Sequence, residues 1–305
     1  MKRRHFLLMP AAAGLAVALS PALRAYADAA VAQGTPVDGS LAQRIVVAGG
    51  DLTEIVFALG AGDRVIGVDQ TSTWPPEVSE RAQIGYVRRL SPEGVLSLAP
   101  DLLLAAHDAG PDIAFEQLEA AGVPVARAPR AKRAEDVAAK IRFVGQAIGK
   151  GAEAEALAAA YEADLASVSG KVATIDAAPR VLFVLSVRNG APMVGGTDTS
   201  ADAMIGHAGG VNAAAGVEGY KPMNREAIIA AAPEVILMMR QHAERLGGVG
   251  EIMAMPEIAL TPAGLAGQAV TMDGMLLLGF GPRTPEAIAE LARALHAERA
   301  VAAGL

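Results

Sequence analysis

Residues 90–104, with the sequence LSPEGVLSLAPDLLL, recur without gaps as residues 223–237, MNREAIIAAAPEVIL. In this alignment Glu93 falls on Glu226 and Pro100 falls on Pro233, and a carboxylate residue follows each proline. A Gly-Tyr pair precedes each copy, at residues 85–86 and 219–220. Two copies so far apart predict two similar lobes, because a solenoid would need several short periods.

Each copy predicts a capped helix followed by a buried strand. Ser91 is a candidate N-cap, and Pro92 and Glu93 suit the first turn of the helix that follows. Residues 102–106 are apolar throughout, as in strands of a parallel sheet that are buried on both faces. Further strands are expected at residues 44–48, 64–68, 180–185 and 235–239. A helix with Asp51 as its candidate N-cap is expected over residues 51–59. Strands that alternate with helices predict parallel α/β lobes.

Residues 134–172 lie between the two copies and contain no proline. Leu157, Tyr161 and Leu165 recur every four residues, which predicts a helix with one apolar stripe. The expected fold class is therefore α/β, with two similar parallel-sheet lobes joined by a long rigid helix and a ligand cleft between the lobes. That helix could bend at residues 149–151. The expected bounds are 43–130 for the N-terminal lobe, 131–175 for the connecting helix and 176–305 for the C-terminal lobe.

The first 27 residues have the pattern of an export signal. A basic start, residues 2–4, is followed by a mostly apolar, alanine-rich stretch over residues 6–23. Residues 25–27, Ala-Tyr-Ala, predict cleavage near Ala27. The pair Arg3-Arg4 also fits a twin-arginine signal, so both the Sec and the twin-arginine routes remain open. Residues 28–42 are expected to form a flexible leader, and the mature protein is expected in the periplasm.

Composition excludes several classes of function. A net charge of −7 argues against nucleic acid as a partner, because duplex binding normally needs a basic face. The absence of cysteine excludes disulfides, thiolate metal sites, a thiol nucleophile and the lipid-modified cysteine of a lipoprotein. The sequence also lacks a hydrolase nucleophile elbow and a paired-histidine metal motif. We therefore expect a protein that is not an enzyme.

The predicted topology indicates where a ligand would bind. Open α/β sheets bind ligands beyond the carboxyl ends of their strands. This favours residues 49–51, 107–108, 186–188 and 240–242 as cleft residues, with His107 and His242 among them.

Tyr86 is expected in a loop at the rim of the first lobe. A phenolate can bind ferric haem iron, and Arg88 could stabilise that phenolate or bind a carboxylate. On residue types alone, Tyr86 could equally be a rim residue without a special role.

The run from residue 84 to residue 100 resembles periplasmic haem-binding proteins of ABC haem importers. The two-lobed architecture, the repeated glutamate and the sequence GFGPRTP at residues 279–285 share this resemblance. These proteins belong to the helix-linked class of substrate-binding proteins, which also carries cobalamin and siderophores. The resemblance implies that Tyr86 is the axial ligand of the haem iron and that Arg88 assists it. It also implies that Glu93 and Glu226 dock onto the dimeric permease, although both would suit a helix N-terminus in any protein.

The resemblance implies a function and leaves some details open. The protein would capture haem in the inter-lobe cleft and deliver it to an inner-membrane ABC transporter, downstream of an outer-membrane haem uptake system. His107 could contact the haem, and Arg188 or Arg240 could meet a propionate or cover the distal face. Some relatives carry a histidine in the second-lobe loop that here reads Leu-Ser-Val-Arg at residues 185–188, so one or two haems remain possible. A siderophore or cobalamin receptor and a two-lobed periplasmic enzyme are the alternatives.

Overall fold

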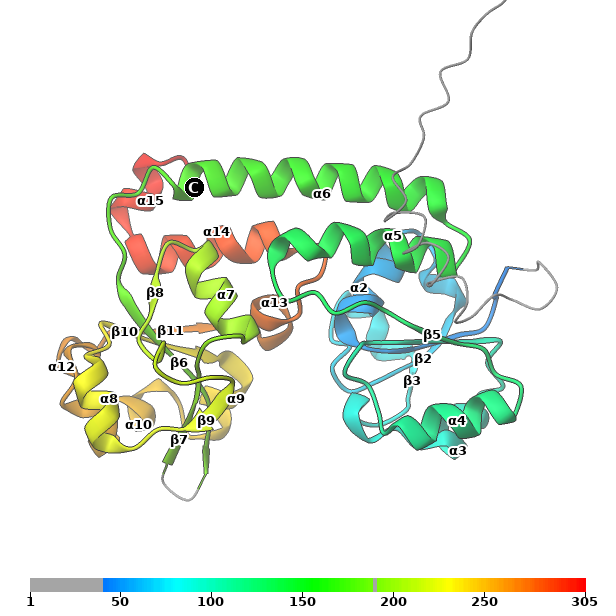
Figure 1. Ribbon diagram of the computed structural model, residues 1–305, viewed down its shortest axis with the longest axis horizontal. Helices are drawn as coiled ribbons and strands as arrows, with labels where there is room; N and C mark the ends of the chain where they lie inside the picture. The colour runs from blue at the N-terminus through cyan, green and yellow to red at the C-terminus, as the bar shows by residue number, and fades with distance from the viewer. Residues whose placement is uncertain (1–40, 189–190) are drawn as a thin grey trace, which may run out of the picture.

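The computed structural model describes residues 41–188 and 191–305 of the chain, which form two α/β lobes beneath a layer of helices (Figure 1). The predicted export signal, residues 1–27, lies outside the described residues, as does the predicted leader up to residue 40. Among the described residues, no helix has both the length and the apolar character that crossing a membrane requires.

The first lobe contains a five-stranded sheet in the order β3-β2-β1-β4-β5, and all of its strand pairs are parallel. Its strands are β1 (Ile45–Ala48), β2 (Val65–Val68), β3 (Ala82–Gln83), β4 (Leu102–Ala105) and β5 (Val125–Arg127). Its helices are α2 (Gly50–Ala58), α3 (Pro92–Leu96) and α4 (Asp112–Ala120), with 3-10 turns η1 (Gly62–Arg64), η2 (Pro76–Glu80) and η3 (Val87–Arg89). The apolar runs of β1 and β4 are fully buried, as a two-sided sheet requires. One local prediction is wrong: the N-cap of α2 is Gly49, and Asp51 lies inside the first turn.

The second lobe has a mixed sheet in the order β11-β10-β6-β7-β9, with β8 paired to β6. Its strands are β6 (Arg180–Arg188), β7 (Ala191–Gly195), β8 (Val211–Asn212), β9 (Tyr220–Pro222), β10 (Val235–Met239) and β11 (Ala269–Met272). The predicted strands β6 and β10 are parallel to each other, and β11, which was not predicted, is parallel to β10. Strand β7 runs antiparallel to both β6 and β9. The difference follows from the short connection after β6, because only an antiparallel partner can be reached without a long crossover.

The duplicated stretch has the same local structure in both lobes. The Ser91 side chain accepts a hydrogen bond from the Gly94 N–H at 3.3 Å, as predicted. In the second copy the N-cap of α8 (Arg225–Ala231) is Asn224, which caps that helix in the same way. Ala99 and Ala232, which immediately precede the two prolines, both have the left-handed backbone conformation, with φ of 47° and 44°. The repeat is therefore structural as well as sequential.

The carboxylate after each proline holds the start of a neighbouring strand. Asp101 accepts a hydrogen bond from the backbone N–H of Arg44 at 3.0 Å, and Glu234 accepts one from that of Arg180 at 2.8 Å. The two arginines in turn donate to carbonyl oxygens after α3 and at the end of α8. These hydrogen bonds satisfy carbonyl groups that a helix end leaves unpaired. The repeated Pro-acid pair therefore connects helix and sheet in each lobe.

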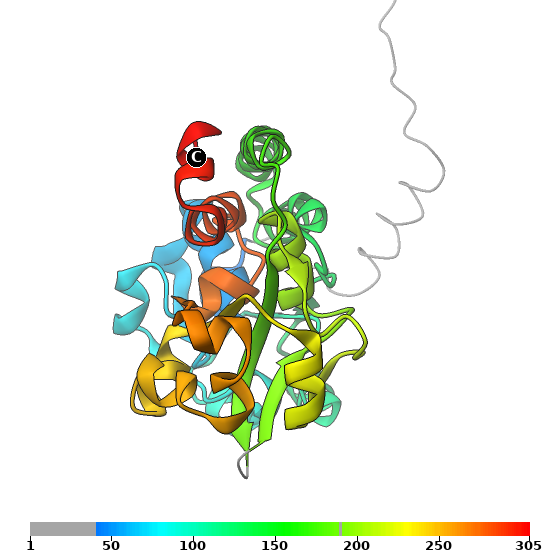
Figure 2. The same ribbon diagram turned by 90° about the vertical axis from the view of Figure 1, so that its left-hand side faces the viewer.

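The connector is a pair of helices rather than one helix. α5 (Val137–Ala147) follows the 3-10 turn η4 (Ala134–Asp136) and ends before Gly149, whose φ of +71° stops the helix. The chain then reverses, so that α6 (Gly151–Val172) packs along α5 and then along α14 (Thr284–His296), as Figures 1 and 2 show. Gly145 permits the close contact, because a Cβ there would lie 2.1 Å from the Cβ of Ala154. This layer of packed helices spans both lobes.

The remaining helices belong to the second lobe and its C-terminal end. They are α7 (Ser200–His207), α9 (Arg240–Arg245), α10 (Val249–Met253), α11 (Pro256–Ala259), α12 (Pro262–Ala266), α13 (Gly274–Leu278) and α15 (Glu298–Ala302). The Thr199 side chain caps α7 by accepting a hydrogen bond from the Asp202 N–H at 3.1 Å.

Candidate functional site

A cavity of about 800 Å³ lies between the two lobes. The first lobe contributes residues that follow β1, β2 and β4, and the second contributes residues that follow β10 and β11. This is the position that parallel sheets favour for a ligand, beyond the carboxyl ends of their strands. α5 also contributes Lys140, so the helical layer closes one side of the cavity.

Tyr86, Arg88 and Asp108 form a hydrogen-bonded chain at the first-lobe side of this cavity. Gly85, with a φ of +92°, lets the backbone turn just before Tyr86, and Arg88 lies in the 3-10 turn that follows. The Arg88 guanidinium donates one hydrogen bond to the Tyr86 hydroxyl oxygen and another to the Asp108 carboxylate. Burial acts to lower the pKa of Arg88, but Asp108 and Tyr86 outweigh it and raise the pKa, so this side chain remains a cation. A charged donor of this kind stabilises negative charge on the tyrosine oxygen.

A buried ion pair lies at the base of the cavity. The Lys140 ammonium lies 2.5 Å from the Asp51 carboxylate, and the Lys140 side chain is only 4% exposed. The same ammonium is 3.4 Å from the Gly279 carbonyl oxygen of the second lobe. Each charge therefore has an opposite partner at a largely buried position, as a buried ion requires. The pair connects α2, α5 and the segment before α14 beneath the ligand space.

The second-lobe wall presents a tyrosine and a coupled His-Arg pair. Tyr220 begins β9 and lines the cavity, with 38% of its surface exposed. His242 and Arg245 of α9 also line the cavity, with the His242 Nδ1 3.3 Å from an Arg245 guanidinium nitrogen. Burial first and Arg245 second lower the pKa of His242, which favours its neutral form. The His242 Nε2 is buried and has no hydrogen-bond partner among the described residues.

Most of the residues predicted for the site line the cavity: Tyr86, Arg88, His107 and His242, with residues 49–51, 108 and 241. Burial lowers the pKa of His107 despite the neighbouring Asp108. Arg188 is the last residue of β6, and its side chain lies outside the described part of the chain.

Arg240 is placed differently from the sequence expectation. It is the first residue of α9 and is exposed, and among the described residues of that helix Gln241, His242 and Arg245 line the cavity instead. Gln241 and Arg245 are four residues apart, so they lie on the same helix face. Sequence reasoning favoured residues 240–242 and missed Arg245, because it considered only the residues directly after the strand.

Glu93 and Glu226 are exposed in the first turns of α3 and α8. Both helices lie on the side of the molecule away from α6, one on each lobe (Figure 1). Neither glutamate lines the inter-lobe cavity within the described structure. Their placement leaves both carboxylates accessible to a partner that contacts the two lobes at once.

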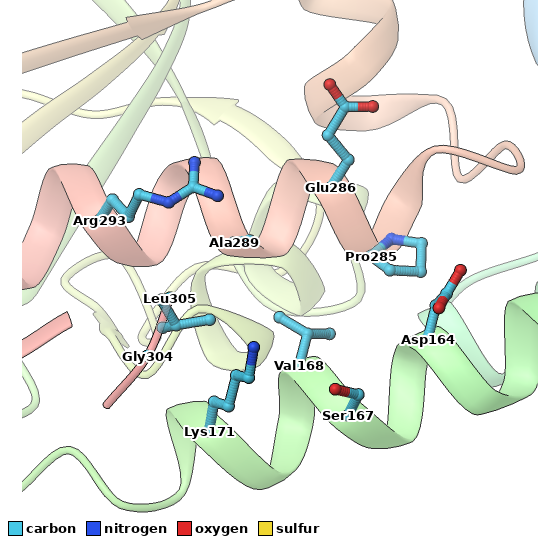
Figure 3. Close-up of a pocket in the computed structure, with 10 residues that line it drawn as sticks. All are labelled: Asp164, Ser167, Val168, Lys171, Pro285, Glu286, Ala289, Arg293, Gly304 and Leu305. Atoms are coloured by element: carbon cyan, nitrogen blue, oxygen red, sulfur yellow. The ribbon is translucent and has the colours of Figure 1, made fainter. Parts of the chain in front are cut away.

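A smaller hollow of about 280 Å³ lies within the helical layer, between α6, α14 and the end of the chain. Figure 3 shows Lys171 of α6, Glu286 and Arg293 of α14, and Leu305 around it. It contains none of the residues that the sequence assigned to the ligand site or to permease docking. In the part of the chain that the structure describes, no group of three or more histidine, aspartate or glutamate side chains is arranged to hold a metal ion.

Comparison with known proteins places this architecture in context. A family model described as periplasmic binding protein matches residues 45–276. The chain is 30% identical over 252 residues to the uncharacterized ABC transporter substrate-binding lipoprotein YvrC of Bacillus subtilis (strain 168), covering 80% of this chain and 77% of that protein. It is 29% identical over 262 residues to the cobalamin-binding protein of Halobacterium salinarum, covering 83% of this chain and 69% of that protein.

Two solved structures are similar over nearly their whole length. The periplasmic heme-binding protein RhuT from Roseiflexus sp. RS-1, in its apo form, is 42% identical with a TM-score of 0.81, covering 85% of this chain and 99% of that one. The periplasmic heme-binding protein BhuT, in complex with two hemes, is 41% identical with a TM-score of 0.80, covering 83% of this chain and 97% of that one.

Proposed function

Because this chain belongs to the periplasmic binding protein family and is the substrate-binding protein of an ABC importer, we propose that its ligand is haem. In this proposal the protein is exported to the periplasm, captures haem in the cavity between its lobes, and delivers it to an inner-membrane permease. Haem reaches the periplasm through an outer-membrane uptake system.

The chain formed by Tyr86, Arg88 and Asp108 carries this proposal. Tyrosine is a known axial ligand of ferric haem iron. Arg88 donates to the tyrosine oxygen and is itself held by Asp108, so the phenolate that binds iron has a fixed cationic partner. The similar solved proteins RhuT and BhuT are named as heme-binding, which supports the same ligand here.

The rest of the cavity suits a flat, largely apolar ligand. Val87 and Ala106 of the first lobe and Leu185, Met239 and Met275 of the second provide apolar walls. Their burial against a porphyrin would supply the hydrophobic part of the binding free energy. Because the lobes are joined by packed helices, we expect little change in the angle between them on binding.

Cobalamin is the second candidate, because a relative of 29% identity is named as a cobalamin-binding protein. A corrinoid would use the same cavity but brings its own cobalt ligands, and it would leave the Tyr86 hydroxyl without a metal to bind. The family is one of transport rather than catalysis, which argues against the two-lobed enzyme.

A titration with hemin, followed by absorption spectroscopy, tests the proposal. We expect saturable binding at one or two hemin molecules per protein, a shifted Soret band and the charge-transfer band of high-spin ferric tyrosinate. Cyanocobalamin at the same concentration should neither bind in calorimetry nor displace hemin. A spectrum that stays that of free hemin, together with calorimetric binding of cyanocobalamin, would replace the haem proposal by the corrinoid one.

The second part of the proposal concerns Glu93 and Glu226 as permease contacts. In the double variant Glu93→Ala/Glu226→Ala, the stimulation of ATPase activity in the reconstituted transporter should be lost, because charge pairs across an interface direct docking. Hemin binding should be unchanged, because neither side chain lines the cavity.

A control variant removes two other exposed carboxylates, Asp164→Ala/Glu298→Ala, from α6 and α15 on the helical side of the molecule. This variant should retain full ATPase stimulation. If the Glu93→Ala/Glu226→Ala protein stimulated the ATPase as strongly as this control, the two glutamates would act only on the N-termini of their own helices and not in docking.

A further inference from the structure

A second hollow of about 790 Å³ adjoins the inter-lobe cavity, and we call it the side chamber. The two spaces have six residues in common, which form their shared wall: Arg88, His107, Asp108, Ala131, Ser200 and Tyr220. Beyond this wall the side chamber is lined by residues 130–133, which lead from the first lobe into η4, and by residues at the start of α7. A ligand on Tyr86 therefore lies next to the side chamber.

The side chamber differs from the main cavity in polarity. The main cavity has several large apolar side chains, among them Leu185, Met239 and Leu278. The side chamber has only Ala131 and Ala203 as apolar lining residues, and nearly all of its other lining side chains are charged or carry a hydroxyl. An amphipathic ligand that occupies both hollows would place its apolar ring system in the main cavity and its polar groups in the side chamber.

The charges in the side chamber are not all paired. Four cationic side chains and four carboxylates line it. Arg88 pairs with Asp108, and Lys132 pairs with Asp198 across the two lobes at 2.8 Å. The remaining carboxylates accept hydrogen bonds from uncharged groups: Asp136 from the backbone N–H groups of residues 132 and 133, and Asp202 from the Asn212 amide.

Arg130 and Arg133 are thereby left without an ion pair among the described residues. Burial and the charge of Arg133 lower the pKa of His207, which lines neither hollow. Arg130 is exposed and lines the side chamber. Its charge contributes to the lowered pKa of His107, after burial, and to the lowered pKa of Asp198, after the Lys132 ion pair. His107 belongs to the shared wall and Asp198 to the second lobe, and Arg130 lines the same chamber as both.

We propose that the side chamber binds the carboxylate groups of the ligand and that Arg130 is their principal contact. The inference rests on the proposed function, in which the carboxylates are the haem propionates. A guanidinium can donate two parallel hydrogen bonds to a carboxylate, and its positive charge makes these bonds stronger than those from a neutral amide. The Lys132–Asp198 ion pair holds the segment that carries Arg130 against the second lobe.

Comparison of hemin with hemin dimethyl ester, which lacks the carboxylates, tests this inference. Both are titrated against wild type and Arg130→Ala, and the dissociation constants are read from the Soret band. Wild type should prefer hemin over the ester, and Arg130→Ala should bind hemin about tenfold more weakly, the size expected for losing a charge-assisted hydrogen bond. Binding of the ester should be equal in the two proteins, and Arg130→Lys should restore most of the preference.

Two further arginine variants serve as controls. Arg225→Ala removes an exposed arginine outside both hollows, and Arg245→Ala removes a cation of the main cavity. Both should keep the wild-type preference for hemin. An Arg130→Ala protein that keeps this preference, or that loses hemin and ester binding equally, overturns the role of Arg130, as does loss of the preference in Arg245→Ala. A wild type that binds neither compound overturns the proposed function instead.

Discussion

The variant Tyr86→Phe should lose the tyrosinate charge-transfer band of the hemin complex and bind hemin about 100-fold more weakly or worse. Changes to residues that only support a metal ligand already cost 10- to 100-fold in affinity, so loss of the ligand itself should cost at least the upper value. Phenylalanine keeps the aromatic ring, over which the Arg88 guanidinium lies 5.7 Å from the ring centroid. The substitution therefore removes the hydroxyl oxygen while it keeps the packing of the loop.

Tyr220→Phe is the matched control, because it makes the same change on the opposite wall of the cavity. We expect it to keep the charge-transfer band, since Tyr220 is followed two residues later by Pro222 and has no arginine at the position equivalent to Arg88. An unchanged hemin complex in Tyr86→Phe would remove Tyr86 from the iron site. If the band disappeared only in Tyr220→Phe, the iron ligand would lie in the second lobe.

The second large effect concerns an ion pair that joins the lobes and does not itself line the inter-lobe cavity. Glu54 of α2 accepts two hydrogen bonds from Arg283, which precedes α14, at 3.0 and 2.5 Å. The Glu54 side chain is 5% exposed, and the Arg283 guanidinium lies 4.5 Å above the ring of Trp74. A Cβ on Gly281 would lie 3.1 Å from the Glu54 carboxylate. Because glycine has no Cβ, the segment 279–285 can pass close to Glu54 and bring Arg283 to this position.

Arg283→Met should lower the free energy of unfolding by about 3–5 kcal/mol, because it leaves a buried carboxylate without its partner. Urea denaturation followed by circular dichroism measures this loss, and the fluorescence of Trp74, the single tryptophan of the chain, reports the change at the contact. The control is Arg142→Met, which breaks exposed ion pairs with Glu155 and Glu162 and should cost no more than about 1 kcal/mol. Equal losses of unfolding free energy in the two variants would show that the buried ion pair stabilises the fold no more than the exposed pairs do.

The loss in Arg283→Met should also depend on pH. Burial already raises the pKa of Glu54 in the folded protein, against the lowering effect of Arg283, and removal of Arg283 raises it further. A carboxyl group with a raised folded pKa favours the folded state while it is protonated. That contribution is lost as the pH rises above the unfolded value of about 4.3. The deficit relative to wild type should therefore be larger at pH 7.5 than at pH 4.5, and a deficit that grows toward low pH would contradict this assignment.

Much of the architecture could be predicted because its signals are local. The duplicated stretch predicted two lobes, and its caps at Ser91 and before Glu226 formed as their residue types require. The apolar strands became the buried strands β4 and β10. The rule that ligands bind beyond strand ends favoured His107, which lines the same cavity as Tyr86 and Arg88 of the expected rim loop. In each case the deciding interaction joins residues a few positions apart, or follows from the order of strands and helices.

Other features were decided only by the tertiary structure. The reversal between α5 and α6, the antiparallel β7 and the turn of α9 that presents Arg245 instead of Arg240 all depend on which surfaces pack together. The same is true of the charges that shape the site. Lys140 meets Asp51 across 89 positions of sequence and Arg283 meets Glu54 across 229. The sequence by itself thus determined the lobes and the tyrosine–arginine pair, whereas the partners of the buried charges emerged only when folding brought distant segments within hydrogen-bonding distance.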